Sequence, residues 1–254
     1  MTSTSFIEDR VEELKAALVF CTRLPLLHAA PAAGETIGKA AWAFPLAGLV
    51  VGLIGSAIYG LAHRLGLPPW PAAALAVAAT LLATGALHED GLADTADGFG
   101  GGKSREQKLA IMRDSRIGTY GVCALALSLL LRVSALASLP SAHAVVWALI
   151  AAHAGARAGM PALMLMLPPA RSDGLSFAAG RPPAESVAAA AIIGFVVVAF
   201  CLPLGHAIAA LILLAAIAGL MAWLATRQIG GQTGDVLGAL EQLGEIAVLL
   251  AALG

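Results

Sequence analysis

Hydrophobic residues in this chain occur in long, nearly uncharged runs that are separated by short polar segments. A helix needs about 20 apolar residues to cross a bilayer, and seven runs approach or exceed that length. The pattern therefore predicts an all-α, polytopic integral membrane protein with about seven transmembrane helices. The predicted spans cover residues 40–62, 70–87, 120–139, 143–167, 186–202, 206–226 and 236–253.

Apolar residues near the amino terminus recur at alternating spacings of four and three, with charged residues between them. They are Ile7, Val11, Leu14, Leu18 and Cys21. This spacing predicts an amphipathic helix that lies on the membrane surface or against another helix. We expect the helix to end at Arg23-Leu24-Pro25.

Composition supports the membrane assignment. Hydrophobic residues make up 59% of the 254 residues and charged residues 12%, whereas a soluble domain carries about 25% charged residues. The mean hydropathy is +0.86, and a net charge of −1 gives no reason to expect a nucleic-acid partner. The three cysteines lack the paired spacing of a zinc site or a disulfide framework. Because no internal repeat is evident, residues 1–254 are interpreted as a single membrane domain.

The basic residues predict how the chain is oriented in the membrane. If the amino terminus is cytoplasmic, twelve Lys and Arg residues fall in cytoplasmic segments and only Arg64 in an external one. An excess of Lys and Arg marks cytoplasmic loops. We therefore expect a multi-pass membrane protein with its amino terminus in the cytoplasm. Loops 88–118, 168–185 and 227–235 would lie together on its cytoplasmic face.

The segment 88–118 contains eleven of the 31 charged residues of the chain and is the predicted active-site loop. Asp90, Asp94 and Asp97 follow the spacing i, i+4, i+7, so a helix would place the three carboxylates on one face. Carboxylates held that close repel one another unless a cation lies between them, and their oxygens favour hard cations such as Mg²⁺. We expect Asp90, Asp94, Asp97 and, from the third loop, Asp235 to bind Mg²⁺. Asp94 and Asp97 are also predicted to be catalytic, with Asp97 as the general base.

Two arginines precede the next predicted span, where the start of a helix suits a phosphate or diphosphate. The expected substrate contacts here are Arg113, Ser115 and Arg116, the last of which is also predicted to be catalytic. The nearby Arg105 is interpreted only as a positively charged membrane anchor.

Ionisable residues within predicted spans are costly and are therefore functional candidates. Arg157 and Glu245 are predicted to lie at similar depth and to face a shared polar interior. His153 is interpreted as a packed core residue. The remaining candidate substrate-binding residues are His88, Arg157, Thr233, Gly234, Glu241 and Glu245.

Three motifs carry a resemblance to a known family. They are His-x-Asp-Gly-Leu-Ala-Asp-Thr-x-Asp-Gly at 88–98, Asp-Ser-Arg-x-Gly-Thr at 114–119 and Gly-x-Thr-Gly-Asp at 231–235. The chain resembles the cobalamin-5′-phosphate synthase family, also called adenosylcobinamide-GDP ribazoletransferase, over nearly its whole length. The resemblance implies a Mg²⁺-dependent transferase. The 3′-hydroxyl of α-ribazole, or of its 5′-phosphate, would displace GMP from adenosylcobinamide-GDP. Association with a second copy, or with other enzymes of cobalamin assembly, stays open.

Three other functions are weighed against this one. An intramembrane prenyltransferase would need a second aspartate-rich loop, and here that loop offers only Asp235. A CDP-alcohol phosphotransferase would need an Ala-Arg pair and a glycine between aspartate pairs, which are missing. A cation-coupled transporter places its carboxylates at the bilayer midplane, usually within repeats, whereas these cluster near one predicted edge. Release of GMP from a nucleotide-activated corrinoid would separate the classes.

Overall fold

The structure is a computed structural model, and its described residues are 3–25 and 34–254. Those residues form thirteen α-helices and one short 3₁₀ helix. The one β feature within these two ranges is an isolated bridge between Pro169 and Gln232. The predicted all-α class is confirmed.

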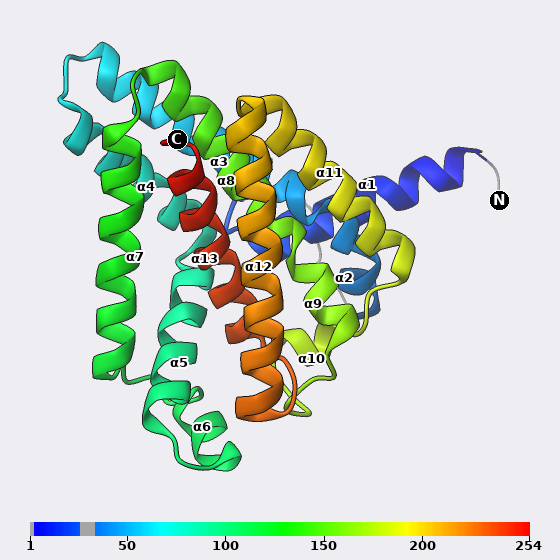
Figure 1. Ribbon diagram of the computed structural model, residues 1–254. Helices are drawn as coiled ribbons and strands as arrows, with labels where there is room; N and C mark the ends of the chain where they lie inside the picture. Colours follow the sequence, from blue (N-terminus) through cyan, green and yellow to red (C-terminus); the bar gives the residue numbers. More distant parts are fainter. Residues whose placement is uncertain (1–2, 26–33) are drawn as a thin grey trace.

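The helices differ widely in length, and several short ones connect the long ones (Figure 1). In chain order they are α1 (Ser3–Cys21), α2 (Gly34–Ala40), η1 (Ala41–Ala43), α3 (Phe44–Arg64), α4 (Pro69–Thr84), α5 (Leu87–Gly101), α6 (Arg105–Ile111), α7 (Thr119–Ser138), α8 (Ala142–Ala158), α9 (Met160–Met166), α10 (Leu175–Ala179), α11 (Ala184–Cys201), α12 (Leu204–Ile229) and α13 (Gly234–Ala251). The segment predicted as an active-site loop, 88–118, is therefore mostly helical, since it contains α5 and α6.

Five helical segments of the described chain are long and apolar enough to cross a bilayer. They are Thr36–Arg64, Thr119–Ser138, Ala142–Met166, Ala184–Cys201 and Leu204–Ile229. The helices α4 and α5 meet at 89° and add a sixth crossing if they are counted as one broken span. The polytopic membrane architecture is confirmed, with five or six candidate crossings compared with about seven predicted. The predicted span at 236–253 forms α13, which is not among them.

Helix α13 is enclosed by α5, α7, α8 and α12 and passes through the middle of the bundle (Figure 1). Two glycines bring its first half against α5. A Cβ atom on Gly91 of α5 would lie 2.8 Å from the carbonyl oxygen of Asp235, and one on Gly238 would lie 3.1 Å from that of His88. Small residues at a helix crossing let two backbones approach closely. This crossing fixes the acidic face of α5 beside the start of α13.

A second close pair, α3 with α8, holds α8 in place beside α13. A Cβ atom on Gly48 of α3 would lie 2.1 Å from the carbonyl oxygen of His153, and one on Gly52 would lie 2.9 Å from the Cα atom of Ile150. The two helices therefore touch backbone to backbone over more than one turn. As a result, the polar side chains of α8 point into the centre of the bundle, toward α13.

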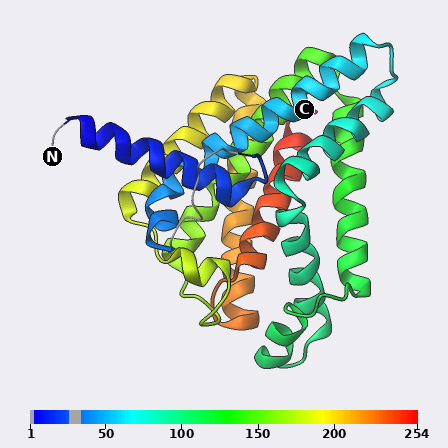
Figure 2. The ribbon, with the colours of Figure 1, turned by 180° about the vertical axis from the view of Figure 1, so that it is seen from behind.

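The chain bends sharply between α4 and α5, where Gly85 and Ala86 have φ angles of 66° and 57°. Ala86 is the one residue other than glycine with positive φ in the described ranges, and L-residues rarely adopt that conformation. The segment after α1 supports the bend, because the backbone N–H of Arg23 donates to the carbonyl of Ala83 at 2.7 Å. The Arg23 side chain also covers Gly85. The bend directs α5 toward one end of the bundle (Figure 2).

The predicted amino-terminal helix is present as α1, and only its second half packs against the body. Phe20 stacks on Phe44 with ring centroids 5.4 Å apart, and Glu13 accepts a hydrogen bond from the indole N–H of Trp42 at 2.6 Å. The first half projects from the bundle (Figure 2) and leaves Ile7 62% exposed. This exposed apolar side is consistent with contact with a membrane surface.

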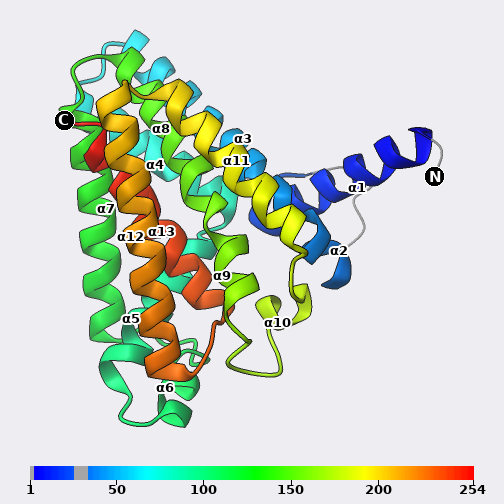
Figure 3. The same cartoon turned by 45° about the vertical axis from the view of Figure 1, so that its right-hand side comes forward.

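Helix α6, helix α10 and the connection from α12 to α13 lie at the same end of the molecule (Figures 1 and 3). Arg105 of α6 links the loop before α10 to the end of α12, because its guanidinium donates to the carbonyl of Ala170 at 2.5 Å and to that of Ile229 at 2.8 Å. Residues of the three predicted loops therefore lie close together at this end of the molecule, and the location of this end on the cytoplasmic face stays a prediction. Arg105 has a structural role besides the membrane anchoring interpreted from the sequence, because it holds these segments together; the anchoring stays a prediction.

Candidate active site

The acidic face of α5 meets the first turn of α13. Asp94 experiences the negative charges of Asp90, Asp97 and Asp235, and the positive charge of Arg171. Asp90 is exposed and Asp94 is half-buried, while the side chain of Asp235 is 17% exposed. The structure thus brings together the four aspartates that the sequence predicted as metal ligands.

Asp97 is held more firmly than its neighbours. Its Oδ2 accepts a hydrogen bond from the backbone N–H of Gly118 at 2.7 Å, and its Oδ1 accepts one from that of Gly121 at 2.9 Å. These groups lie at the amino-terminal end of α7, where a carboxylate is favourable. Asp97 therefore ties α5 to α7. Since both of its oxygens are engaged, the geometry favours Asp94 over Asp97 as a general base.

The donor set at this site fits a hard divalent cation. Four carboxylates supply only oxygen ligands, which Mg²⁺ prefers. Asp90 and Asp94 face Asp235 across the α5–α13 crossing, and Arg171 is the cation that acts on both Asp94 and Asp235. Carboxylates gathered in excess over nearby cations are stabilised when a further cation binds. Binding of Mg²⁺ at Asp90, Asp94, Asp97 and Asp235 stays a prediction.

Arg171 lies in the loop between α9 and α10 and was missed by the sequence analysis. Its Nη2 is 3.3 Å from Oδ2 of Asp235, and its Nε is 3.6 Å from Oδ1 of Asp173. Asp173 also binds Arg113, at 2.6 Å from each carboxylate oxygen. Alternating charges therefore connect the loop before α7, the loop before α10 and the start of α13. In the sequence, Arg171 was only one of many basic residues in loops predicted to be cytoplasmic.

Arg116 lies apart from the aspartates. Its side chain is 87% exposed, and it donates hydrogen bonds to both oxygens of Asp114, the shortest at 2.7 Å. These hydrogen bonds lower the pKa of Asp114 to about 2, so the pair is ionised at neutral pH. The predicted catalytic role of Arg116 stays a prediction. It would require Arg116 to leave Asp114 for a substrate.

Three cavities meet at Asp90. A cavity of about 460 Å³ between α5 and α7 is lined by Arg113, Ser115 and Asp94 as well. A cavity of about 520 Å³ lies at the α4–α5 bend and includes Arg23. The third is smaller, about 130 Å³, and reaches Arg171. Asp90 is thus accessible from more than one direction.

A buried network of charges lies behind the aspartates. Nη1 of Arg157 is 2.5 Å from Oε1 of Glu241 and 3.1 Å from Oε1 of Glu245. The predicted pairing of Arg157 with Glu245 in a polar interior is confirmed. Arg132 lies 2.8 Å from Glu89 and 3.3 Å from Glu245. All five side chains are at least 94% buried, so their charges must offset one another.

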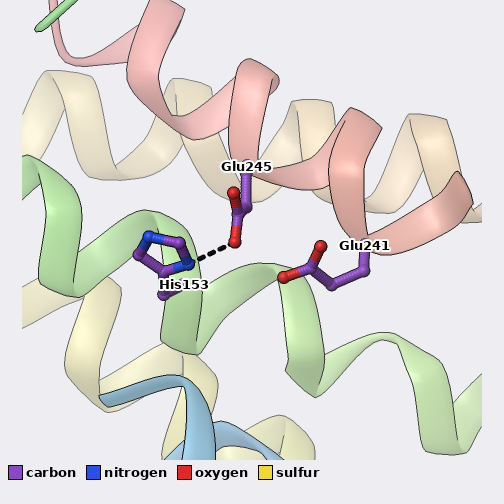
Figure 4. Close-up of side chains that lie close together, drawn as sticks. All are labelled: His153, Glu241 and Glu245. Carbon is purple, nitrogen blue, oxygen red and sulfur yellow. Dashed lines mark ion pairs between the residues drawn. The ribbon is translucent and has the colours of Figure 1, made fainter. Parts of the chain in front are cut away.

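Among the described residues, one group of three potential metal ligands has all its ligand atoms within 4.8 Å of one another (Figure 4). The group consists of His153, Glu241 and Glu245. His153 forms an ion pair with Glu245 and is 2% exposed, so the predicted packed histidine is confirmed. Two guanidinium groups, from Arg132 and Arg157, already contact these carboxylates. We therefore interpret the triad as a structural network that supports α13.

The start of α13 is fixed by Thr233, which is 1% exposed. Its hydroxyl accepts a hydrogen bond from the backbone N–H of Val236 at 3.3 Å and lies 3.1 Å from Oδ2 of Asp235. Thr233 therefore caps the helix and positions Asp235. Gly234 follows it and lines the smallest cavity beside His88. For Thr233 and Gly234, substrate binding stays a prediction.

Comparisons with known proteins identify relatives over nearly the full chain. A family model described as cobalamin-5-phosphate synthase matches residues 13–253. A relative from Bradyrhizobium diazoefficiens, named adenosylcobinamide-GDP ribazoletransferase, is 57% identical over 98% of this chain and 96% of its own length. Proteins of the same name from Mesorhizobium japonicum and Azorhizobium caulinodans are 54% and 48% identical, each over 95% of this chain and over 93% and 95% of their own lengths. No solved structure matches the chain significantly.

Proposed function

The chain belongs to the cobalamin-5-phosphate synthase family and is an enzyme of cobalamin biosynthesis, and we propose that it joins adenosylcobinamide-GDP to α-ribazole or α-ribazole 5′-phosphate. GMP is the leaving group, and Mg²⁺ is the required cation. The reaction takes place on the cytoplasmic face of a bacterial inner membrane, at the acidic face of α5.

One observation carries this proposal: Asp90 and Asp94 of α5 lie beside Asp235 of α13, across the contact of Gly91 with Gly238. Displacement at a diphosphate needs positive charge beside the diphosphate oxygens. The aspartates would hold Mg²⁺, which when bound neutralises charge on those oxygens. Relatives at up to 57% identity are named after the same transfer.

The side chains of the site have distinct roles in this proposal. The hydroxyl oxygen of the ribazole forms a bond to the corrinoid-linked phosphorus, and the bond from that phosphorus to the bridging oxygen breaks, so that GMP leaves. The hydroxyl proton passes to the carboxylate of Asp94, which is half-buried and faces the shared cavity. Asp97 holds α5 against the start of α7 by accepting hydrogen bonds from two backbone N–H groups. Arg113 and Ser115 line the wall of the cavity, where they can contact the nucleotide.

The test is direct measurement of both products. Purified protein in lipid nanodiscs is incubated with adenosylcobinamide-GDP, Mg²⁺ and either α-ribazole or its 5′-phosphate, and GMP and the joined corrinoid are quantified. We expect the two products in equal amounts, formed only when Mg²⁺ is present. The ratio of kcat/KM values for the two acceptors then identifies the preferred substrate.

Asp94→Asn is the matching variant, because it removes one charge at nearly constant volume. We expect its turnover to fall by several orders of magnitude. Glu185→Gln removes an exposed carboxylate elsewhere and should keep wild-type turnover. If folded Asp94→Asn protein keeps more than about a tenth of wild-type turnover, the role of Asp94 is refuted. That limit corresponds to ~1.4 kcal/mol of transition-state stabilisation.

A further inference from the structure

A small cavity lies between α5, the loop before α10 and the start of α13. Its volume is about 130 Å³, and its polar lining residues are His88, Asp90, Arg171 and Asp235, with the backbone of Gly234 beside them. One water molecule needs about 10–15 Å³ of such space, so the cavity can hold a group of several atoms. Apolar side chains from α1, α9 and α10 complete the wall.

Two donors at this cavity have no hydrogen-bond partner among the described residues. Nε2 of His88 is buried in a residue that is 1% exposed, and Nη1 of Arg171 is also buried. Nδ1 of His88 lies 3.4 Å from Nη2 of Arg157 and 3.9 Å from Oε2 of Glu241. A guanidinium can only donate, so the shorter contact is a hydrogen bond when Nδ1 accepts, and in that tautomer the ring proton is on Nε2. Buried donors are nearly always paired in proteins, so both donors point to an anionic or polar ligand.

A second guanidinium nitrogen of Arg171, Nη2, already contacts the predicted metal site. Its Nη2 lies 3.3 Å from Oδ2 of Asp235. A divalent cation bound by Asp235 would compete with this guanidinium for the same carboxylate. Occupation of Asp235 by a cation therefore favours release of Arg171 toward a second anion. In the cavity, that anion would lie within reach of Nε2 of His88.

We propose that this cavity binds one phosphoryl group of the diphosphate substrate, with Arg171 and Nε2 of His88 as the donors. Arg171 neutralises Asp235 in the empty enzyme and exchanges it for phosphate oxygens when a divalent cation and the substrate bind. The planar fork of arginine suits two oxygens of one phosphate. This inference rests on the proposed function and adds a substrate-binding residue to it.

The first experiment measures binding of Mn²⁺, in place of Mg²⁺, to substrate-free protein by electron paramagnetic resonance. Arg171→Gln removes the competing cation, so we expect Mn²⁺ to bind at least fivefold more tightly than to the wild type. Arg181→Gln is the matched control, because Arg181 lies in the same predicted loop, 168–185, and donates to the carbonyl of Leu165. Its Mn²⁺ affinity should equal that of the wild type.

The second experiment measures binding of inorganic pyrophosphate by calorimetry at saturating Mn²⁺. We expect Arg171→Gln to bind pyrophosphate at least tenfold more weakly than the wild type. Arg171→Lys keeps the charge and loses the fork, so it should bind Mn²⁺ as the wild type does and pyrophosphate with intermediate affinity. A tighter metal site combined with weaker pyrophosphate binding is a result that simple damage to the fold would not give.

The outcomes separate this inference from the proposed function. If wild-type protein binds Mn²⁺ but Arg171→Gln changes neither affinity, or weakens both, the role of Arg171 is refuted and the metal site stands. If wild-type protein binds no Mn²⁺, the metal-dependent function and this inference are refuted together.

Discussion

Gly91→Ala tests whether the α5–α13 crossing positions the site. The added Cβ would lie 2.8 Å from the carbonyl oxygen and 3.0 Å from the Cα atom of Asp235, whereas ordinary contacts begin at 3.4 Å. The two backbones would have to separate by about half an ångström at the point where the aspartates meet. Overpacking of this kind costs about 1–3 kcal/mol, and the higher helix propensity of alanine returns ~0.5–1 kcal/mol.

The expected net loss in the free energy of unfolding is therefore about 1 kcal/mol, or a decrease of roughly 2–4 °C in Tm. The effect on GMP release should be larger, because a misplacement of about 1 Å can cost 10²-fold in rate. We expect turnover to fall at least tenfold. Gly219→Ala in α12 is the control, since a Cβ there meets nothing within 4 Å. If Gly91→Ala protein is as active as Gly219→Ala protein, close approach at this crossing is not needed for the site.

Three further variants test other contacts. Arg157→Met leaves two buried carboxylates without this guanidinium and should lower the free energy of unfolding by about 3–5 kcal/mol. Adding Glu241→Gln to this variant should recover part of the loss. Strictly additive losses would show that Arg157 and Glu241 are not coupled. Asp97→Asn keeps only one acceptor oxygen for two backbone N–H groups. We therefore expect thermal unfolding to show a loss of about 1–3 kcal/mol in the free energy of unfolding. An unchanged Tm would contradict the role of Asp97 in joining α5 to α7. Arg105→Gln should speed proteolysis of the loop 168–185, and wild-type resistance would mean that the contacts of Arg105 do not order the loop.

Much of the architecture could be predicted because it depends on local composition. Apolar runs predicted the long membrane helices, and the i, i+4, i+7 spacing predicted that the aspartates share a face of α5. The pairing of Arg157 with Glu245 followed from their matched depth in two predicted spans. Each of these inferences rests on helix geometry and on the cost of burying charge in an apolar environment.

Features that depend on contacts between distant segments were not predicted. The bend at Ala86 requires a positive φ in a residue that favours helix, and the backbone of Arg23 supports it only in the folded chain. In the sequence, Arg171 is not distinguishable from other basic residues in loops. Its contact with Asp235 exists only in the folded chain. Arg132 had no visible partner because Glu89 is adjacent to the aspartate motif and 43 residues away in sequence. Sequence periodicity predicts which residues share a face of a helix, but it does not predict which segment of the chain packs against that face.

We propose that α5 and α13 together form one divalent-cation site, and metal binding to two variants tests this site most directly. Asp90→Asn alters the contribution of α5 and Asp235→Asn that of α13, while Glu185→Gln serves as the exposed control. The measurement is the affinity of each purified protein for Mn²⁺, determined by electron paramagnetic resonance. We predict at least tenfold weaker binding for both aspartate variants, which is ~1.4 kcal/mol each, and wild-type affinity for the control. Wild-type affinity in Asp235→Asn protein would contradict a site shared by the two helices.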